Sequence, residues 1–165
     1  MKNTIVIAIM ILFFGLLQST VFVDVLSIEE IKPDLLLIVI AFVAFKYGGM
    51  AGQLAGFAAG IFQEFFSPAL LGSYAFVFTV VGYGISFVQH KMSVDNYITS
   101  ALIVFIATII KGLMFGFLAL FFGEISVMYG SYIVSGFLLE LVLNPLFAIP
   151  LFWFMNRFAA PTPRK

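Results

Sequence analysis

Long apolar runs alternate with short polar, glycine-containing or proline-containing segments along the whole chain. A helix needs about 20 apolar residues to cross the hydrocarbon core of a bilayer. Judged against that length, the pattern predicts six transmembrane helices, over residues 4–23, 34–47, 49–66, 69–89, 97–122 and 131–157. The polar interruptions are too short to hold a soluble domain, so we expect one polytopic transmembrane domain over residues 1–165.

Two of these runs need comment. The apolar part of the second, Leu35 to Phe45, would rise only about 16 Å as a helix, so it needs a thinned bilayer or polar ends that reach the interfaces. The first run resembles a signal peptide, but "FGLLQSTVF" offers no small-residue cleavage site and the apolar segment continues to Val23. We expect it to remain as a helix.

Composition agrees with a membrane location, because 63% of the residues are hydrophobic and only 10% are charged. The chain has no cysteine, which excludes disulfides, iron–sulfur clusters and thiol nucleophiles. The net charge is zero and there is no basic run, which argues against a nucleic-acid partner. The sequence therefore predicts an all-α integral membrane protein.

The placement of charge orients the predicted bundle. Basic residues favour the cytoplasmic side of a membrane. Only Lys32 falls on one side of the predicted bundle, whereas the other side receives Lys2, Lys46, Lys91, Arg157, Arg164 and Lys165. Both termini are therefore predicted to be cytoplasmic. The acidic residues are expected at or near the opposite, outer face, and they are Asp24, Glu29, Glu30, Asp34, Glu64 and Glu124.

The third run carries a ladder of small residues, with Gly52, Gly56 and Gly60 spaced every four positions. Small residues at this spacing let helix backbones approach closely inside a membrane. Packing within the bundle is the preferred interpretation, and a docking face for another protein is the alternative. Gln63 and Glu64 continue the same face toward the outer surface, where they either extend to the interface or contact a partner.

A lysine interrupts the fifth run, in "FIATIIKGLMFGF". A charge at membrane depth usually has a partner. Lys111 lies about 16 Å from the outer end of its predicted helix and Glu140 about 14 Å from the outer end of the next, so we expect the two to pair. Asn144 lies one turn beyond Glu140 on the same face, and Pro145 frees the carbonyl of Leu141 nearby. A structural pair is preferred over an ion or proton relay, because a relay needs a longer chain of titratable groups.

No arrangement of residues points to catalysis. The lone His90 falls in a predicted loop, the serines lack a histidine and carboxylate at triad-like positions, and no paired acidic motif suggests a metal. We therefore expect a protein that is not an enzyme and that needs neither a cofactor nor a metal.

The order of these features resembles the MreD family of bacterial rod shape-determining proteins. The resemblance is carried by "LQST" in the first run, Pro33-Asp34 before the second, the glycine ladder of the third, Gly72 before the fourth and Gly82-Tyr83 near its end. Length, number of spans and the late proline-containing helix agree. The chain departs from the family at Glu64, where aspartate is frequent, so the charge is kept on a longer side chain.

The resemblance implies a non-catalytic scaffold in the bacterial cytoplasmic (inner) membrane. Its implied direct partner is MreC, with the MreB cytoskeleton and the wall-elongation synthases as indirect partners, beside the lipid bilayer and a possible homo-oligomer. The family's fold is similar to the substrate-binding (S) component of energy-coupling-factor transporters. That similarity supplies the alternative function, a solute-binding subunit of a vitamin-type transporter, which the sparseness of intramembrane polar residues disfavours.

Overall fold

The computed structural model describes residues 2–19, 32–67, 70–88, 97–122 and 135–158. Every regular element in these ranges is a helix, which confirms the all-α prediction. The helices are α1 (Lys2–Ser19), α3 (Leu35–Tyr47), α4 (Gly49–Glu64), α5 (Ser73–Ser86), α6 (Tyr97–Phe122) and α8 (Ser135–Phe158). Each of these six helices occupies one of the predicted spans.

The bounds differ most where turns replace the ends of predicted spans. Helix α4 stops at Glu64 and α5 begins at Ser73, so the predicted end at 66 lies beyond α4, and the predicted start at 69 lies outside the described residues. Residues 20–23, 89 and 131–134 lie outside the described ranges, as do His90 and the predicted loops at 90–96 and 123–131. Within the described residues, 98–122 of α6 and 136–158 of α8 are long and apolar enough to cross a bilayer alone, and the remaining apolar helices are shorter.

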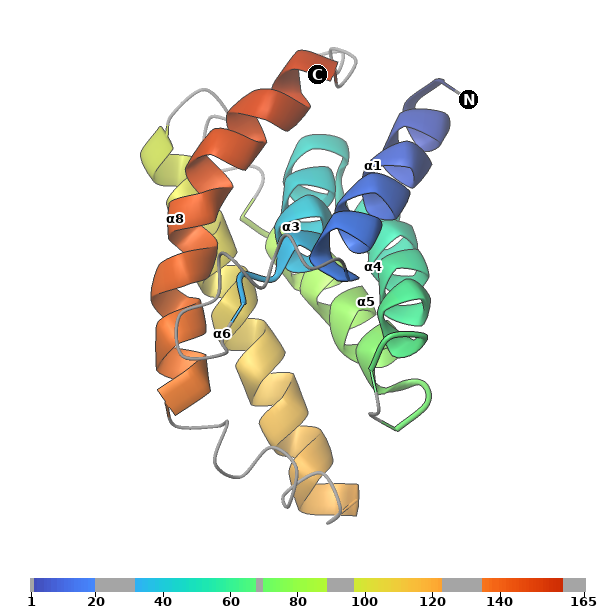
Figure 1. Cartoon of the computed structure of the whole chain (residues 1–165), viewed down its shortest axis with the longest axis vertical. Coiled ribbons are helices and arrows are strands. Elements are labelled where there is room, and N and C mark those ends of the chain that lie inside the picture. The colour runs from blue at the N-terminus through green and yellow to red at the C-terminus, as the bar shows by residue number, and fades with distance from the viewer. Residues whose placement is uncertain (1, 20–31, 68–69, 89–96, 123–134, 159–165) are drawn as a thin grey trace.

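The short helix α3 is the centre of the molecule. All of its residues from Leu35 to Phe45 are buried, and α1, α4, α5, α6 and α8 all pack against it (Figure 1). A helix that is apolar on every side fits such a position, because it presents no polar face to water. Helix α3 therefore faces protein along its length, which explains how 13 residues, about 20 Å, suffice for this element.

Helices α4 and α5 form an antiparallel hairpin through the glycine ladder. A Cβ atom added at Gly56 would overlap the backbone of Phe78, and one at Gly60 would overlap the backbone of Ala75. At Gly52 the added atom would lie 2.6 Å from both the Gly82 carbonyl and the Ala44 side chain. The three glycines thus let α4 and α5 approach at backbone distance. Gly72, with φ of 93°, precedes α5 and supplies a left-handed turn at its start.

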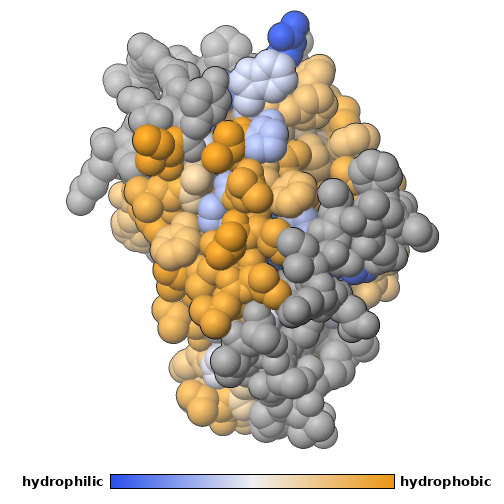
Figure 2. All heavy atoms as spheres, turned by 60° about the vertical axis from the view of Figure 1, so that its left-hand side comes forward, coloured by the Kyte–Doolittle hydropathy of each residue, from blue (hydrophilic) through white to orange (hydrophobic). Residues whose placement is uncertain are grey.

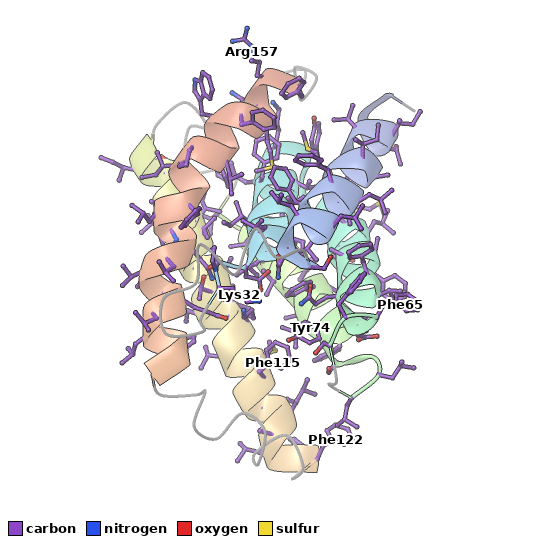
Figure 3. The ribbon with its side chains drawn as sticks, viewed as in Figure 1. Lys32, Phe65, Tyr74, Phe115, Phe122 and Arg157 are labelled. Carbon is purple, nitrogen blue, oxygen red and sulfur yellow. The ribbon has the colours of Figure 1, made fainter. Side chains whose placement is uncertain are left out.

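Large apolar side chains cover the outside of the bundle. Figure 2 shows that hydrophobic residues make up most of the described surface on the α8 side. Phe65 and Phe122 extend outward, whereas the rings of Tyr74 and Phe115 meet edge-on with their centroids 5.1 Å apart (Figure 3). Leu71 and Leu120 are 94% and 85% exposed. Apolar residues outside, with a charged cluster inside, are the distribution of a membrane protein.

A buried polar cluster at the start of the central helix

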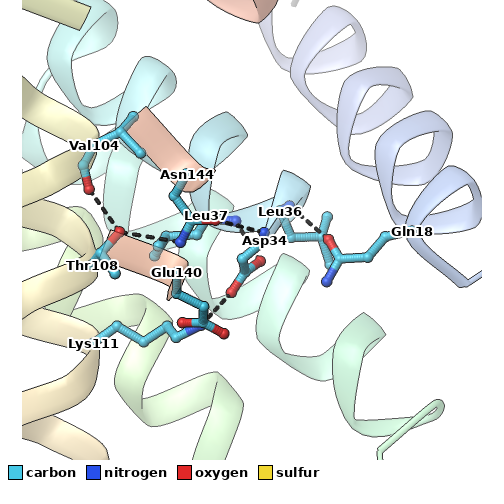
Figure 4. A network of polar contacts seen from close by, with 9 residues as sticks. All are labelled: Gln18, Asp34, Leu36, Leu37, Val104, Thr108, Lys111, Glu140 and Asn144. Atoms are coloured by element: carbon cyan, nitrogen blue, oxygen red, sulfur yellow. Dashed lines mark hydrogen bonds and ion pairs between the residues drawn. The ribbon is translucent and has the colours of Figure 1, made fainter. Parts of the chain in front are cut away.

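Lys111 of α6 lies between two carboxyl groups (Figure 4). Its Nζ is 2.8 Å from Oε2 of Glu140, on α8, and 2.9 Å from Oδ2 of Asp34, immediately before α3. The side chains of Lys111, Asp34 and Glu140 are only 10%, 7% and 11% exposed. The three charges are therefore removed from solvent and satisfied mainly by one another.

The cluster lies well inside the span of the long helices. Lys111 is eleven residues before Phe122, so α6 continues for about 16 Å beyond the cluster toward its C-terminal end. It is fourteen residues after Tyr97, about 21 Å from the other end. A bilayer has a hydrocarbon core of about 30 Å. At such a depth each charge would be costly alone, and direct pairing offsets part of that cost.

The N-terminus of α3 is capped by side chains from three places in the sequence. The backbone N–H of Asp34 donates to Oδ1 of Asn144 at 2.8 Å, and that of Leu36 donates to Oε1 of Gln18 at 3.0 Å. The N–H of Leu37 donates to Oδ1 of Asp34 itself at 3.0 Å, the standard role of an aspartate N-cap. The first amides of a helix lack intrahelical acceptors, and inside a membrane water cannot replace them.

Asn144 joins this cap to α6. Its Nδ2 donates to Thr108 Oγ1 at 3.2 Å, and the Thr108 hydroxyl donates to the carbonyl of Val104 at 2.9 Å. Asn144 and Thr108 are completely buried. Since Asn144 also accepts from Asp34, one amide side chain contacts both neighbours of α8 in the cluster, α3 and α6.

The structure brings Lys111 and Glu140 together, and Asn144 lies in the same cluster, where its hydrogen bonds join it to the backbone of Asp34 and to Thr108 instead of to the ion pair. It corrects the expected position of Asp34, which lies in the buried cluster instead of at the outer face. The signal for this position is present in the sequence. Pro33-Asp34 precedes an apolar run too short to cross a bilayer, which is the pattern of a helix that begins at depth, and the packing of the other helices selects this arrangement over a thinned bilayer. Gln18, from the "LQST" stretch of the first run, also contacts α3, and its spacing in the sequence does not predict that contact.

The predicted glycine face is covered by another helix. Gly52, Gly56 and Gly60 are buried against α5, as an interior packing role requires. Glu64 accepts a hydrogen bond from the backbone N–H of Ala75 at 3.1 Å, so its carboxyl group caps the start of α5. Gln63 is partly exposed beside it. Of the proposed face, only the end at Gln63 and Glu64 is accessible.

The cluster has the properties of a structural junction. Its polar atoms are directed at one another, and no group of three or more His, Cys, Asp or Glu suited to a metal occurs among the residues that the structure describes. The positive end of the α3 dipole, a common binding site for anions, is occupied by oxygens of Asn144, Gln18 and Asp34. A free anion at this helix end would have to displace the protein's own side chains.

Comparison with known proteins identifies one family. A family model described as rod shape-determining protein MreD matches residues 1–158. No curated protein and no solved structure matches significantly.

Proposed function

The chain belongs to the MreD family of rod shape-determining proteins, and from this premise we propose that it is a scaffold on which MreC docks directly. Proteins of this family are non-catalytic membrane components of the cell elongation machinery. MreB and the wall-elongation synthases are then engaged indirectly, and the protein resides in the bacterial cytoplasmic membrane.

The observation that carries the proposal is the self-contained character of the polar cluster. A solute-binding subunit needs polar groups that converge on a pocket and remain available to the ligand. Here the start of α3, the obvious place for such a site, is closed by Gln18, Asp34 and Asn144. Lys111 and Glu140 pair with each other and serve, in this proposal, to hold α3, α6 and α8 in register.

The glycine ladder is assigned to internal packing, because a partner helix cannot reach residues that α5 covers. Gln63, partly exposed at the outer end of α4, remains the candidate contact for MreC. Gln53 is also partly exposed, and it lies near the opposite end of α4. The two glutamines are therefore a matched pair for testing this contact.

The proposed orientation places both termini in the cytoplasm. Both described ends of the chain lie at the upper end of Figure 1, where Arg157 extends from α8 (Figure 3). Lys46, at the end of α3, donates a hydrogen bond to Asn156 and so belongs to the same end. Basic residues at that end support a cytoplasmic location. Because the protein has no cysteine, Ile28→Cys can be labelled selectively, and labelling only from the cytoplasm would contradict this orientation.

The decisive experiment is purification of the tagged protein from its own membrane and identification of the proteins that accompany it. MreC and other elongation proteins support the scaffold, whereas an ATPase module or a bound vitamin supports the transporter alternative. Gln63→Ala should reduce recovery of MreC without changing the melting temperature of the purified protein, and Gln53→Ala should alter neither. Equal recovery from both variants would remove Gln63 from the interface while leaving the docking of MreC to be judged from the wild type.

A further inference from the structure

Helix α8 contains two prolines, Pro145 and Pro150, and it is the only helix in the described part of the chain with a proline in its interior. Proline has no backbone N–H, so the carbonyls of Leu141 and Leu146 lack the donor that would normally bond to them within the helix. Sharp bends in long helices are concentrated at such positions. Two missing hydrogen bonds within about one and a half turns weaken α8 at one place.

The outer part of α8, before these prolines, is held by buried polar contacts. Glu140 pairs with Lys111 at 2.8 Å, and Asn144 contacts both Asp34 and Thr108. Breaking one partner of a buried ion pair is strongly destabilising. This part of α8 is therefore fixed to α6 and to the start of α3.

The inner part of α8, after the prolines, is held differently. Phe152 and Met155 are buried, and the ring of Phe152 meets Phe42 edge-on at 5.2 Å. The hydrogen bond from Lys46 to Asn156 in this part is exposed, in contrast to the buried polar contacts of the outer part. Apolar packing is less directional than the ion pairs, so small displacements of this part cost less.

Helices α3 and α8 nevertheless keep one register along their shared length. Contacts join Asp34 to Asn144, Phe42 to Phe152 and Lys46 to Asn156, and each joins residues 110 positions apart. The two helices therefore run parallel over this length. Between the polar and apolar contacts lie Leu146, which is 59% exposed, and Pro150, which is also exposed.

We propose that α8 is jointed at Pro145–Pro150, so that its inner part, residues 151–158, changes its angle to α3 while the polar cluster holds the outer part in place. The moving end carries Arg157, at the same end of the bundle as the N-terminus. The joint is a conformational device that does not depend on the identity of any partner.

The test measures distances between two spin labels, each attached to an introduced cysteine. Labelling is specific to these positions because the chain has no cysteine of its own. Labels at Leu138 and Phe154 lie on opposite sides of the prolines, on exposed positions 16 residues apart. Labels at Phe105 and Phe121 are also exposed and 16 residues apart, on α6, which has no proline. Both pairs are separated by about 24 Å in a straight helix. We expect the distance distribution of the α8 pair to be broader than that of the α6 pair.

The variant Pro145→Ala with Pro150→Ala should narrow the α8 distribution to the width seen for α6. It should also slow hydrogen exchange of the amides at 146–149 by about tenfold, the factor that corresponds to one net backbone hydrogen bond. Leu146→Ala, in the same segment, should neither narrow the α8 distance distribution nor slow hydrogen exchange. Equal widths for the two pairs in the wild type would overturn the proposal, and so would a double variant that folds without narrowing. If the double variant does not fold, the wild-type comparison decides alone.

Discussion

The α4–α5 hairpin and the junction of α3, α6 and α8 hold helices together by opposite means. In the hairpin, close contact depends on the absence of side chains, because Gly52, Gly56 and Gly60 leave room for the backbone of α5. In the junction, contact depends on charged and amide groups that need specific partners.

This difference determines which kind of substitution destabilises each region. The hairpin joins neighbours in sequence, and its packing fails when volume is added. The junction joins residues 29 to 110 positions apart, and it fails when one polar partner is removed and another is left without a counterpart. Changes in volume and changes in charge should therefore affect the two regions in different ways.

The largest effect is expected from Lys111→Met, because it leaves two carboxyl groups buried without a cation. Loss of one member of a buried pair costs about 3–5 kcal/mol of unfolding free energy. The measurement is a denaturant titration of the purified protein in detergent or bilayer. Lys46→Met is the matched control, and its cost should stay below about 1 kcal/mol, since the hydrogen bond of Lys46 to Asn156 is exposed. Equal losses in the two variants would show that the cluster does not depend on its cation.

A second prediction separates the roles of the two carboxyl groups. From the sequence alone, Lys111→Met combined with Glu140→Leu is expected to be nearly neutral. The structure changes this expectation, since Asp34 would remain buried without its cation, and the double variant should still lose about 3 kcal/mol. Adding Asp34→Asn should restore most of that loss, because asparagine can still cap α3. A double variant as stable as the wild type would contradict the three-residue cluster.

A smaller effect is expected in the hairpin. Gly56→Ala adds one methyl group against the backbone of Phe78 and should cost about 1–3 kcal/mol through overpacking. Gly116→Ala is the control, since no atom lies within 4 Å of its added Cβ. Alanine also favours a helix by up to about 1 kcal/mol, so this control should be neutral or stabilising. The same titration compares them, and similar changes would show that α4 and α5 do not require the close approach.

The smallest effect is expected from Gln18→Leu, which leaves the N–H of Leu36 without an acceptor. An unsatisfied amide that is partly buried should cost about 1–2 kcal/mol. Faster hydrogen exchange at Leu36 would locate the change at the start of α3. Gln53→Leu removes a glutamine of similar exposure from α4 and should leave exchange at Leu36 unaltered. If both variants behave alike, the contact from α1 does not support α3.

Much of this molecule follows from local pattern. Apolar runs and turn residues predict the helices, because a membrane requires every backbone amide to be bonded within its own element. Four-residue glycine spacing predicts close packing of α4, since it places the glycines on one side of a helix. Counting depth from helix ends brings Lys111 and Glu140 to one level, because rise per residue is constant in a helix.

The tertiary structure decided which of these helices occupies the centre. A helix that is apolar on every side has the same kind of sequence whether lipid or protein surrounds it. The sequence of α3 therefore does not distinguish a lipid-facing span from a core helix. Once five helices surround α3, its start lies at depth, and Asp34, Asn144 and Gln18 meet there across 18 to 110 residues of sequence. That meeting depends on packing among distant elements, which no local spacing records.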